Sequence, residues 1–402
     1  IPEKRPVHDE IGERMKMGKY EGAFVFQPIP GLYEDVVFFD FTSSYGSIIV
    51  TYNLSKSTFL EKPEKNAYSI EALEKKVYFS KKPGFFPEML KEIILLRKKY
   101  KQELKNKEDA LTAARSNAFK LLANSSYGYQ GFFGARYYCR EAAAATAAFA
   151  RQSIKDTIEK INKAGYKTIY SDTDSIAFLQ NKKTKQETLN FLKKVNEELP
   201  GIMELELEDF YKRGIWVTKR TGEYGAKKKY ALVNENGKIK IRGFETVRRN
   251  WCNLARETQN KILRMILEDG NEKRALSYVK EIIKKIKERK IERKEILIRT
   301  QLRKAISEYK AISPHVIAAK KMEEQKIPID EGALIEYFIA ETREKKKLVR
   351  EKVKLVHEKG EYDIKYYLER QILPAVENIL QVFNVNINEI IQGKKQTKLG
   401  DF

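Results

Sequence analysis

The chain has 402 residues, of which 42% are hydrophobic, so it can fold into two or three packed units. Basic residues outnumber acidic ones by 78 to 56, and the resulting charge of +22 favours a polyanionic partner such as nucleic acid over an inert basic surface. Two cysteines are too few for a disulfide framework or a cysteine-rich zinc site. The low cysteine count therefore predicts a reducing, cytoplasmic compartment. The sequence contains no run of about 18 apolar residues that could span a membrane.

The N-terminal part of the chain contains a strand that ends in a carboxylate. Residues 1–35 hold short apolar runs among glycines and prolines, which predicts strands and turns. The apolar run 36–39 predicts a buried strand with Asp40 at its end. A single Asp in such a place is usually a turn or cap residue, so its meaning depends on other residues.

Three helices are predicted between this strand and the middle of the chain. Over 87–105 apolar residues recur at helical spacing, while Arg97 and Lys101 lie four apart on another face. A short turn leads to a second helix over 108–124, and the two form an antiparallel pair. A third helix over 141–163 is rich in alanine and should pack closely.

A polar stripe continues past the end of the second helix. Lys120, Asn124 and Tyr127 are four and three residues apart, so they share one helix face. Gly128 allows close backbone approach. An ordinary solvated face is the alternative, but it would rarely end in Asn-Ser-x-Tyr-Gly.

A hairpin over 166–179 carries two further carboxylates, Asp172 and Asp174, at its tip. Carboxylates that converge at a sheet edge repel one another unless a divalent cation such as Mg²⁺ lies between them. Asp-Thr-Asp is also a plausible turn. A helix over 185–198 and strands within 204–232 follow. Beyond a composition shift near residue 225, helices are predicted over 251–268, 272–292, 298–310, 313–325 and 364–382.

Several segments, in order, resemble the motifs of family B DNA polymerases of the archaeal branch. Asp40-Phe-Thr-Ser-Ser-Tyr-Gly-Ser-Ile-Ile49 resembles motif A, Lys120-Leu-Leu-Ala-Asn-Ser-Ser-Tyr-Gly128 resembles motif B, and Tyr170-Ser-Asp-Thr-Asp-Ser175 resembles motif C. Lys227-Lys-Lys-Tyr-Ala231 and Arg242-Gly-Phe-Glu-Thr-Val-Arg-Arg-Asn-Trp251 resemble two further elements of that family. The likeness runs from about residue 20 to the last residue.

The resemblance implies an α+β, right-hand polymerase fold with an antiparallel-sheet palm, helical-hairpin fingers and a mainly helical thumb. The palm would comprise residues 1–86 and 132–225, the fingers 87–131, and the thumb, with a C-terminal clamp-binding tail, 226–402. The implied enzyme is a DNA-directed DNA polymerase that adds dNTPs to a primer 3′ end on template DNA. A cytoplasmic, nucleoid-associated location would fit that activity.

The same resemblance assigns roles to individual residues. Asp40 and Asp174, with the Phe41 carbonyl, would bind two Mg²⁺ ions, and Asp172 would be a supporting catalytic carboxylate. The nucleotide-binding residues would be Ser44, Tyr45, Gly46, Arg97, Lys101, Lys120 and Asn124. Tyr45 would be a steric gate beneath the sugar. The DNA-binding residues would be Tyr127, Gly128, Lys227, Lys228, Lys229, Tyr230, Arg242 and Gly243.

Motif A departs from the family pattern on both sides of Tyr45. Ser44 and Gly46 stand where the family has Leu and Pro. These smaller residues predict a larger or softer pocket around the sugar and tolerance of modified nucleotides, whether the change is engineered or natural drift.

Two features concern partners. The carboxylates of the family's 3′–5′ exonuclease are missing from the chain, which begins at Ile1, so we expect either a removed domain or a separate chain that supplies it. Gln396, Leu399 and Phe402 fit the pattern Gln-x-x-aliphatic-x-x-aromatic of a sliding-clamp-binding box, with a frayed tail as the alternative.

Two other function classes fit the sequence less well. An inactivated polymerase that serves as a scaffold would have no reason to keep Asp40, Asp172, Asp174 and Lys120. Another palm-type two-metal enzyme, such as a cyclase or a nuclease, would lack the polar stripe and the basic C-terminal part.

Overall fold

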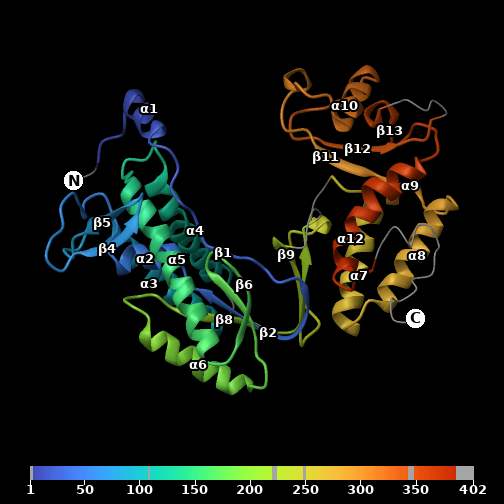
Figure 1. Ribbon diagram of the computed structural model, residues 1–402. Helices are drawn as coiled ribbons and strands as arrows, with labels where there is room; N and C mark the ends of the chain where they lie inside the picture. The colour runs from blue at the N-terminus through green and yellow to red at the C-terminus, as the bar shows by residue number, and fades with distance from the viewer. Residues whose placement is uncertain (1–2, 107–108, 220–223, 248–249, 343–347, 386–402) are drawn as a thin grey trace. The chain divides into compact units, whose positions relative to one another are not determined.

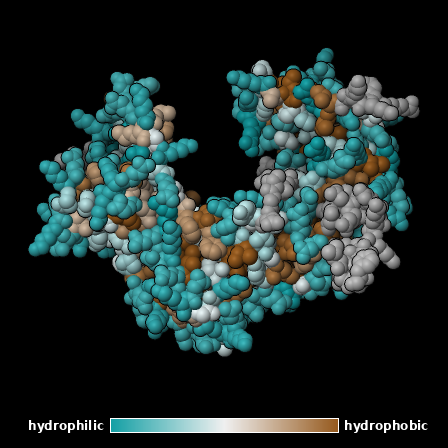
Figure 2. Space-filling view, viewed as in Figure 1, coloured by the Kyte–Doolittle hydropathy of each residue, from teal (hydrophilic) through white to brown (hydrophobic). Residues whose placement is uncertain are grey.

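The computed structural model describes residues 3–106, 109–219, 224–247, 250–342 and 348–385 (Figure 1). The chain divides into two compact units, which are described separately. The first unit comprises Ile1–Gln27 and Asp35–Phe210, and the second comprises Pro28–Glu34 and Tyr211–Phe402. On the face shown in Figure 2, hydrophilic side chains cover most of the surface of each unit, as expected for a chain with 33% charged residues.

An antiparallel sheet forms the centre of the first unit. Its strand order is β1-β6-β7-β2-β8, in which β2 and β8 also contribute residues to the second unit. The strands are β1 (Val25–Phe26), β6 (Lys167–Asp172), β7 (Ser175–Leu179), β2 (Gly31–Phe41) and β8 (Leu205–Thr218). The predicted buried strand is confirmed, because all four residues from Val36 to Phe39 are fully buried within β2.

Helix α5 packs against this sheet, and further helices pack on one another beside it. The helices are α1 (His8–Lys16), α2 (Ser44–Thr51), α3 (Phe85–Asn106), α4 (Ala110–Gly131), α5 (Arg140–Lys163) and α6 (Lys185–Glu198). The helical pair is confirmed, since α3 and α4 pack against each other over much of their length (Figure 1). The prediction that the alanine-rich helix packs closely is confirmed as well, because α5 is buried continuously from Ala142 to Ala150. A small sheet of order β3-β5-β4 completes the unit, with β3 (Phe59–Leu60), β4 (Tyr68–Ala72) and β5 (Lys75–Phe79).

The expectation of only strands and turns in residues 1–35 is wrong over α1. The Glu10 carboxylate accepts a hydrogen bond from the backbone N–H of Val7 at 3.1 Å, which caps the first turn. Acidic residues begin this helix and basic residues end it, a charge order that favours the helix dipole. None of its residues is buried, so it lacks the apolar periodicity that would have revealed it.

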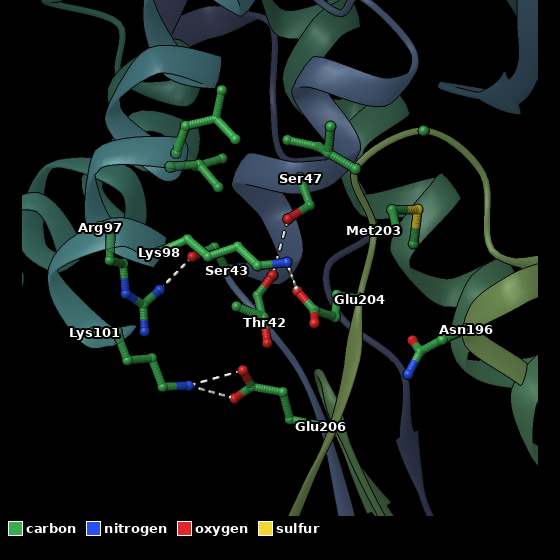
Figure 3. A pocket seen from close by; sticks show the side chains of 14 residues that line it. Thr42, Ser43, Ser47, Arg97, Lys98, Lys101, Asn196, Met203, Glu204 and Glu206 are labelled. Atoms are coloured by element: carbon green, nitrogen blue, oxygen red, sulfur yellow. Dashed lines mark hydrogen bonds and ion pairs between the residues drawn. The ribbon is translucent and has the colours of Figure 1, made fainter. Parts of the chain in front are cut away.

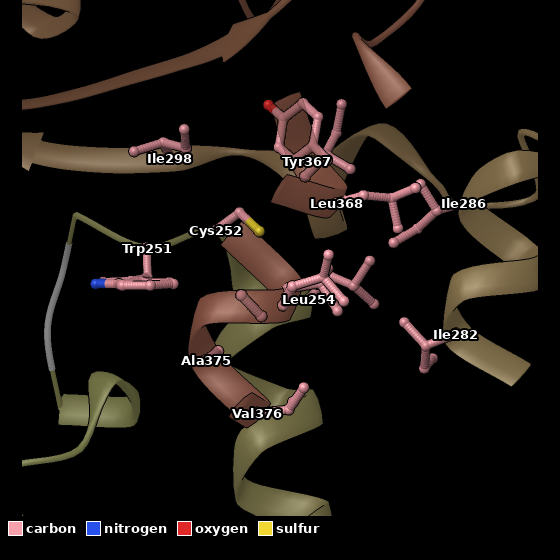
Figure 4. Close-up of a cluster of buried hydrophobic side chains, with 14 of the residues drawn as sticks. Trp251, Cys252, Leu254, Ile282, Ile286, Ile298, Tyr367, Leu368, Ala375 and Val376 are labelled. Carbon is pink, nitrogen blue, oxygen red and sulfur yellow. The ribbon is translucent and has the colours of Figure 1, made fainter. Parts of the chain in front are cut away.

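The second unit combines the end of β8 with β9 (Gly225–Asn234) and β10 (Ile239–Arg242) in antiparallel order. Its helical segments are η1 (Glu245–Val247), α7 (Asn253–Asp269), α8 (Lys273–Lys287), α9 (Arg293–Ile296), η2 (Ile306–Glu308), α10 (Pro314–Glu324), η3 (Val349–Lys352), α11 (Ile364–Tyr366), η4 (Tyr367–Ile372) and α12 (Leu373–Gln381). Its core is a large apolar cluster in which Leu254 of α7, Ile282 of α8 and Val376 of α12 are buried (Figure 4).

The predicted helix over 298–310 is wrong. Residues Ile298–Gln301 form strand β11, which lies in a three-stranded sheet of order β11-β12-β13 with β12 (Leu334–Ile339) and β13 (Val353–Leu355). Ile298 pairs with Tyr337 across this sheet. The local pattern fits a helix or a strand, and pairing with residues far away in sequence selects the strand.

Among the described residues, no helix combines the length and the apolar character needed to cross a bilayer.

Candidate functional site

The three predicted catalytic carboxylates lie at one edge of the sheet in the first unit. Asp40 of β2 pairs in register with Ser175 of β7, and Ser175 also pairs with Asp172 of β6. The Phe41 N–H donates to the carbonyl oxygen of Asp174 at 2.9 Å. The strand register therefore brings residues that are far apart in sequence to one place.

The turn that carries Asp174 is held by its backbone. Thr173 adopts a left-handed conformation with φ of 61°, and its N–H donates to the carbonyl oxygen of Phe24 at 3.1 Å. Backbone strain of this kind is tolerated where the surrounding structure fixes the chain. The hairpin tip is thus anchored to the segment before β1.

The oxygen donors at this edge suit a hard divalent cation. Asp40, Asp172 and Asp174 are each partly exposed, so incoming phosphate or water could reach them. Within the described part of the chain, no group of three or more His, Cys, Asp or Glu side chains is arranged to hold a metal ion. A smaller set of protein donors fits Mg²⁺, which usually keeps several waters and binds substrate phosphates through one or two carboxylates.

Tyr45 of α2 belongs to a cluster of tyrosines beside these carboxylates. Its ring stacks on Tyr127 of α4, with centroids 4.2 Å apart and planes at 17°. Burial raises the pKa of Tyr45, and the negative charge of Asp174 adds to the rise. The hydroxyls of Tyr127 and Tyr20 share a hydrogen bond, so Tyr20 is a site residue that sequence analysis missed.

Tyr45 has two small neighbours in the chain, Ser44 and Gly46. Gly46 lies against two helices. A Cβ at this position would be 3.2 Å from Cδ1 of Ile94 in α3 and 3.6 Å from the carbonyl oxygen of Ala123 in α4. Both Ser44 and Gly46 are buried. The small residue at position 46 therefore lets α2 approach α3 and α4, and the space beside it is filled.

The cations of α3 line a pocket of about 370 Å³ together with Ser43, Glu204 and Glu206 (Figure 3). Arg97 donates a hydrogen bond to the hydroxyl of Ser43, and Lys101 Nζ lies 2.6 Å from Oε2 of Glu206. Burial lowers the pKa of Arg97, against the opposing effect of the charges on Glu206 and Asp40. Arg97 therefore lies within electrostatic reach of the carboxylate edge.

Lys98 is a third cation of this pocket, and sequence analysis did not select it. Its Nζ lies 2.8 Å from Oε2 of Glu204, just before β8 (Figure 3). The lysine-rich stretch of α3 contained no pattern that distinguishes Lys98 from its neighbours.

On α4, Lys120, Asn124 and Gly128 are exposed, whereas Tyr127 is partly buried in the tyrosine cluster. The stripe therefore combines an open polar face with one ring that belongs to the site.

The predicted DNA-binding lysines of β9 differ in their surroundings. Lys227 and Lys228 are exposed. The side chain of Lys229 is only 13% exposed, and its Nζ lies 2.9 Å from Oε1 of Glu245, whose side chain is 6% exposed. Tyr230 is buried. Lys229 and Tyr230 therefore contribute to the interior of the second unit.

Arg242 is the last residue of β10, Gly243 follows it, and both are exposed. Gly243 has φ of 69°, and a Cβ there would lie 2.1 Å from the carbonyl oxygen of Lys228. Only glycine fits so close an approach of two backbone segments. Gln396, Leu399 and Phe402, the residues of the predicted clamp-binding box, lie outside the described residues.

Comparison with known proteins gives the class to which this fold and site belong. The family model for DNA polymerase family B matches residues 3–383. DNA polymerase 1 of Pyrococcus abyssi is 38% identical over 400 residues, which cover 96% of this chain and 50% of that protein. The DNA polymerase of Thermococcus gorgonarius is 36% identical over 410 residues, with 98% of this chain and 51% of that protein covered.

A solved structure agrees with the sequence relatives. The family B DNA polymerase from the hyperthermophilic archaeon Pyrobaculum calidifontis matches with a TM-score of 0.71 and 32% identity, over 96% of this chain and 49% of that chain. The chain therefore belongs to DNA polymerase family B, which confirms the resemblance drawn from its motifs. It spans about half the length of the curated relatives it matches.

Proposed function

We propose that the chain is the polymerising portion of a DNA-directed DNA polymerase, which adds dNTPs to a primer 3′ end. The observation that carries this proposal is the register that brings Asp40, Asp172 and Asp174 to one sheet edge. The cationic pocket of Arg97 and Lys101 supports the proposal, because the charge of Asp40 acts on the pKa of Arg97. Membership of DNA polymerase family B supports nucleotide addition as the reaction at these carboxylates.

Asp40 and Asp174, with the Phe41 carbonyl, would hold two divalent cations, for which we propose Mg²⁺. Such ions, when bound, activate the primer 3′-hydroxyl and neutralise charge on the pyrophosphate leaving group. Asp172 would support this set from the adjacent strand. The role of the protein is to position these oxygens and to orient the two substrates.

The incoming triphosphate would be bound by two helices in the proposed fingers, residues 87–131. Arg97 and Lys101 come from α3, while Lys120 and Asn124 come from α4. Movement of the two helices toward the palm would bring both rows onto the phosphates. Tyr45 would lie beneath the sugar, where a 2′-hydroxyl would clash with its ring.

Primer–template DNA would be bound mainly through its phosphates. The exposed cations Lys227, Lys228 and Arg242 of the second unit are the strongest candidates. Binding through phosphates is independent of sequence and weakens as salt rises. We also propose that the terminal residues Gln396–Phe402 bind a sliding clamp, and that any proofreading activity comes from residues beyond this chain.

Primer extension tests the function. The wild-type chain should extend a primer with dNTPs and Mg²⁺, and Asp174→Ala should lower the single-turnover rate by at least about a thousandfold, because electrostatic stabilisation of this kind dominates the barrier. Asp156→Ala, at an exposed carboxylate of α5, is the matched control and should extend as the wild type does. Equal rates for Asp174→Ala and the wild type would rule out the proposed site.

A further inference from the structure

Two lysines of α3 that line the pocket are paired with carboxylates of the first unit. Lys98 pairs with Glu204 at 2.8 Å, and Lys101 pairs with Glu206 at 2.6 Å (Figure 3). The two acidic residues stand two positions apart, with Glu204 just before β8 and Glu206 as its second residue. They therefore present their charges side by side to two lysines that lie about one helical turn apart.

An anion at this place is favoured by the charges of α3. Arg97, Lys98 and Lys101 are neighbours on one helix, and like charges at such spacing repel one another. Burial raises the pKa of Glu206, but the ion pair with Lys101 and the positive charge of Arg97 act against it, and the pKa lies below its usual value. Glu206 therefore stays ionised at neutral pH.

The position of these carboxylates is fixed by the strands that carry the catalytic residues. The N–H of Thr42, two residues after Asp40, donates to the carbonyl oxygen of Glu204 at 2.9 Å. Ser43, which accepts a hydrogen bond from Arg97, lies on the same short segment. The backbone at Glu204 is thus hydrogen-bonded to the segment that follows Asp40.

We propose that Glu204 and Glu206 are stand-in anions, which hold Lys98 and Lys101 of α3 in the nucleotide-free protein and must be displaced by the incoming triphosphate. This inference rests on the function proposed above and deepens it, because it makes the two glutamates determinants of nucleotide affinity. A ligand gains only the difference between its own contacts with the lysines and the ion pairs that it breaks. The exchange therefore lowers the affinity of the pocket for anions, and an anion with few contacts of its own does not displace the glutamates.

The cost of this exchange is measured by the Kd for dATP. The protein is first bound to a dideoxy-terminated primer on a thymine-containing template, and dATP is then titrated at equilibrium. Glu204→Gln and Glu206→Gln should each lower the Kd for dATP by about two- to fivefold, the range expected for partly exposed ion pairs. The decisive comparison is a double-mutant cycle between Lys98 and Glu204. In the Lys98→Gln background, Glu204→Gln should leave the Kd unchanged, because the ion pair is already absent.

A long-range electrostatic effect would give a different result. Loss of one negative charge near a triphosphate would then lower the Kd by the same factor with and without Lys98, and that outcome would overturn the stand-in role. Glu198→Gln is the matched control, since it breaks the Lys160–Glu198 pair, at 2.7 Å and similarly exposed, in the same unit. This variant should leave the Kd unchanged.

Extension of an ordinary primer by the wild-type protein separates the two proposals. If the wild type neither binds dATP nor extends the primer, both proposals fail. If it does both, but the Glu204 and Glu206 variants bind dATP as the wild type does, the stand-in role alone fails. Urea unfolding midpoints close to that of the wild type would show that the variants are folded.

Discussion

The ring of Tyr45 stacks on the ring of Tyr127 at a centroid distance of 4.2 Å, which joins α2, next to the carboxylate edge, to α4. Tyr127 in turn shares a hydrogen bond with Tyr20, in the segment before β1. Because β1 pairs with β6, which carries Asp172, the cluster is tied to the edge at both ends. Tyr20 is thus a positioning residue for the proposed sugar gate.

Removal of the Tyr20 hydroxyl should loosen that gate. In Tyr20→Phe the Tyr127 hydroxyl loses this partner, and one such hydrogen bond is worth about 1 kcal/mol, or roughly fivefold. We expect the preference for dATP over ATP, measured as the ratio of single-turnover efficiencies, to fall by about that factor. Tyr129→Phe, at an exposed ring of α4, should leave the ratio unchanged. A wild-type ratio in Tyr20→Phe would show that the hydrogen bond does not position the gate.

The contact between Gly46 and Ile94 predicts a coupled pair of substitutions. Gly46→Ala gains helix propensity worth about 1 kcal/mol, but its Cβ would lie 3.2 Å from Cδ1 of Ile94. Ile94→Val deletes that methyl group. Gly46→Ala should therefore raise the free energy of unfolding by about 1 kcal/mol more in the Ile94→Val background than in the wild type.

Urea denaturation of the four proteins measures this coupling. Gly128→Ala is the matched control, because a Cβ there would meet nothing within 4 Å. It should have the same effect in both backgrounds. Strict additivity of Gly46→Ala and Ile94→Val would contradict the close packing of α2 on α3.

Local sequence patterns were enough to predict the elements that carry the carboxylates. The apolar run before Asp40 forms β2, and the β-rich runs around Asp172 form a hairpin, because burial and turn chemistry act within a few residues there. The α3–α4 pair was predicted for the same reason. The resemblance to family B motifs then supplied roles that no single pattern would have given.

Features that depend on distant partners were not predicted. Strand β11 is defined by its pairing with β12, and the acidic residues Glu204 and Glu206 gain meaning only because α3 places Lys98 and Lys101 beside them. A lysine-rich stretch of sequence does not show which of its lysines forms an ion pair with a carboxylate. Such pairings are properties of the folded chain.

Both cysteines should be unreactive in the native protein. Cys139 and Cys252 are free and buried, and burial raises the pKa of each thiol to about 12. The thiolate is the reactive form, so at pH 8 a thiol reagent should modify neither residue until denaturant exposes both. Rapid modification of either residue at pH 8 without denaturant would contradict this burial.

The same shifts predict how stability depends on pH. The folded-state pKa is raised above the unfolded value of about 8.5, so each thiol contributes stability that is complete below that pH and is lost as the pH rises toward 12. The urea midpoint should therefore fall between pH 8 and pH 10.5, and it should fall less in Cys139→Ala/Cys252→Ala.

The ion pair between Lys229 and Glu245 should stabilise the second unit, although the family resemblance assigns Lys229 to DNA binding. Glu245 also accepts a hydrogen bond from Gln259 at 2.7 Å, so its carboxylate is held inside the unit. Lys229→Met leaves that buried charge without this cation and should cost about 3–5 kcal/mol of unfolding free energy. Lys229→Met/Glu245→Gln should recover part of the loss, because the buried carboxylate charge is gone.

Lys227→Gln, at an exposed position of β9 two residues away, is the contrasting variant. Its free energy of unfolding should stay within about 0.5 kcal/mol of the wild type, while DNA binding weakens and the slope of log affinity against log salt falls by about one. Urea unfolding and DNA titrations at several salt concentrations measure the two effects separately. If Lys229→Met were as stable as the wild type and lost DNA affinity in this salt-dependent way, Lys229 would be a phosphate contact instead of a structural cation.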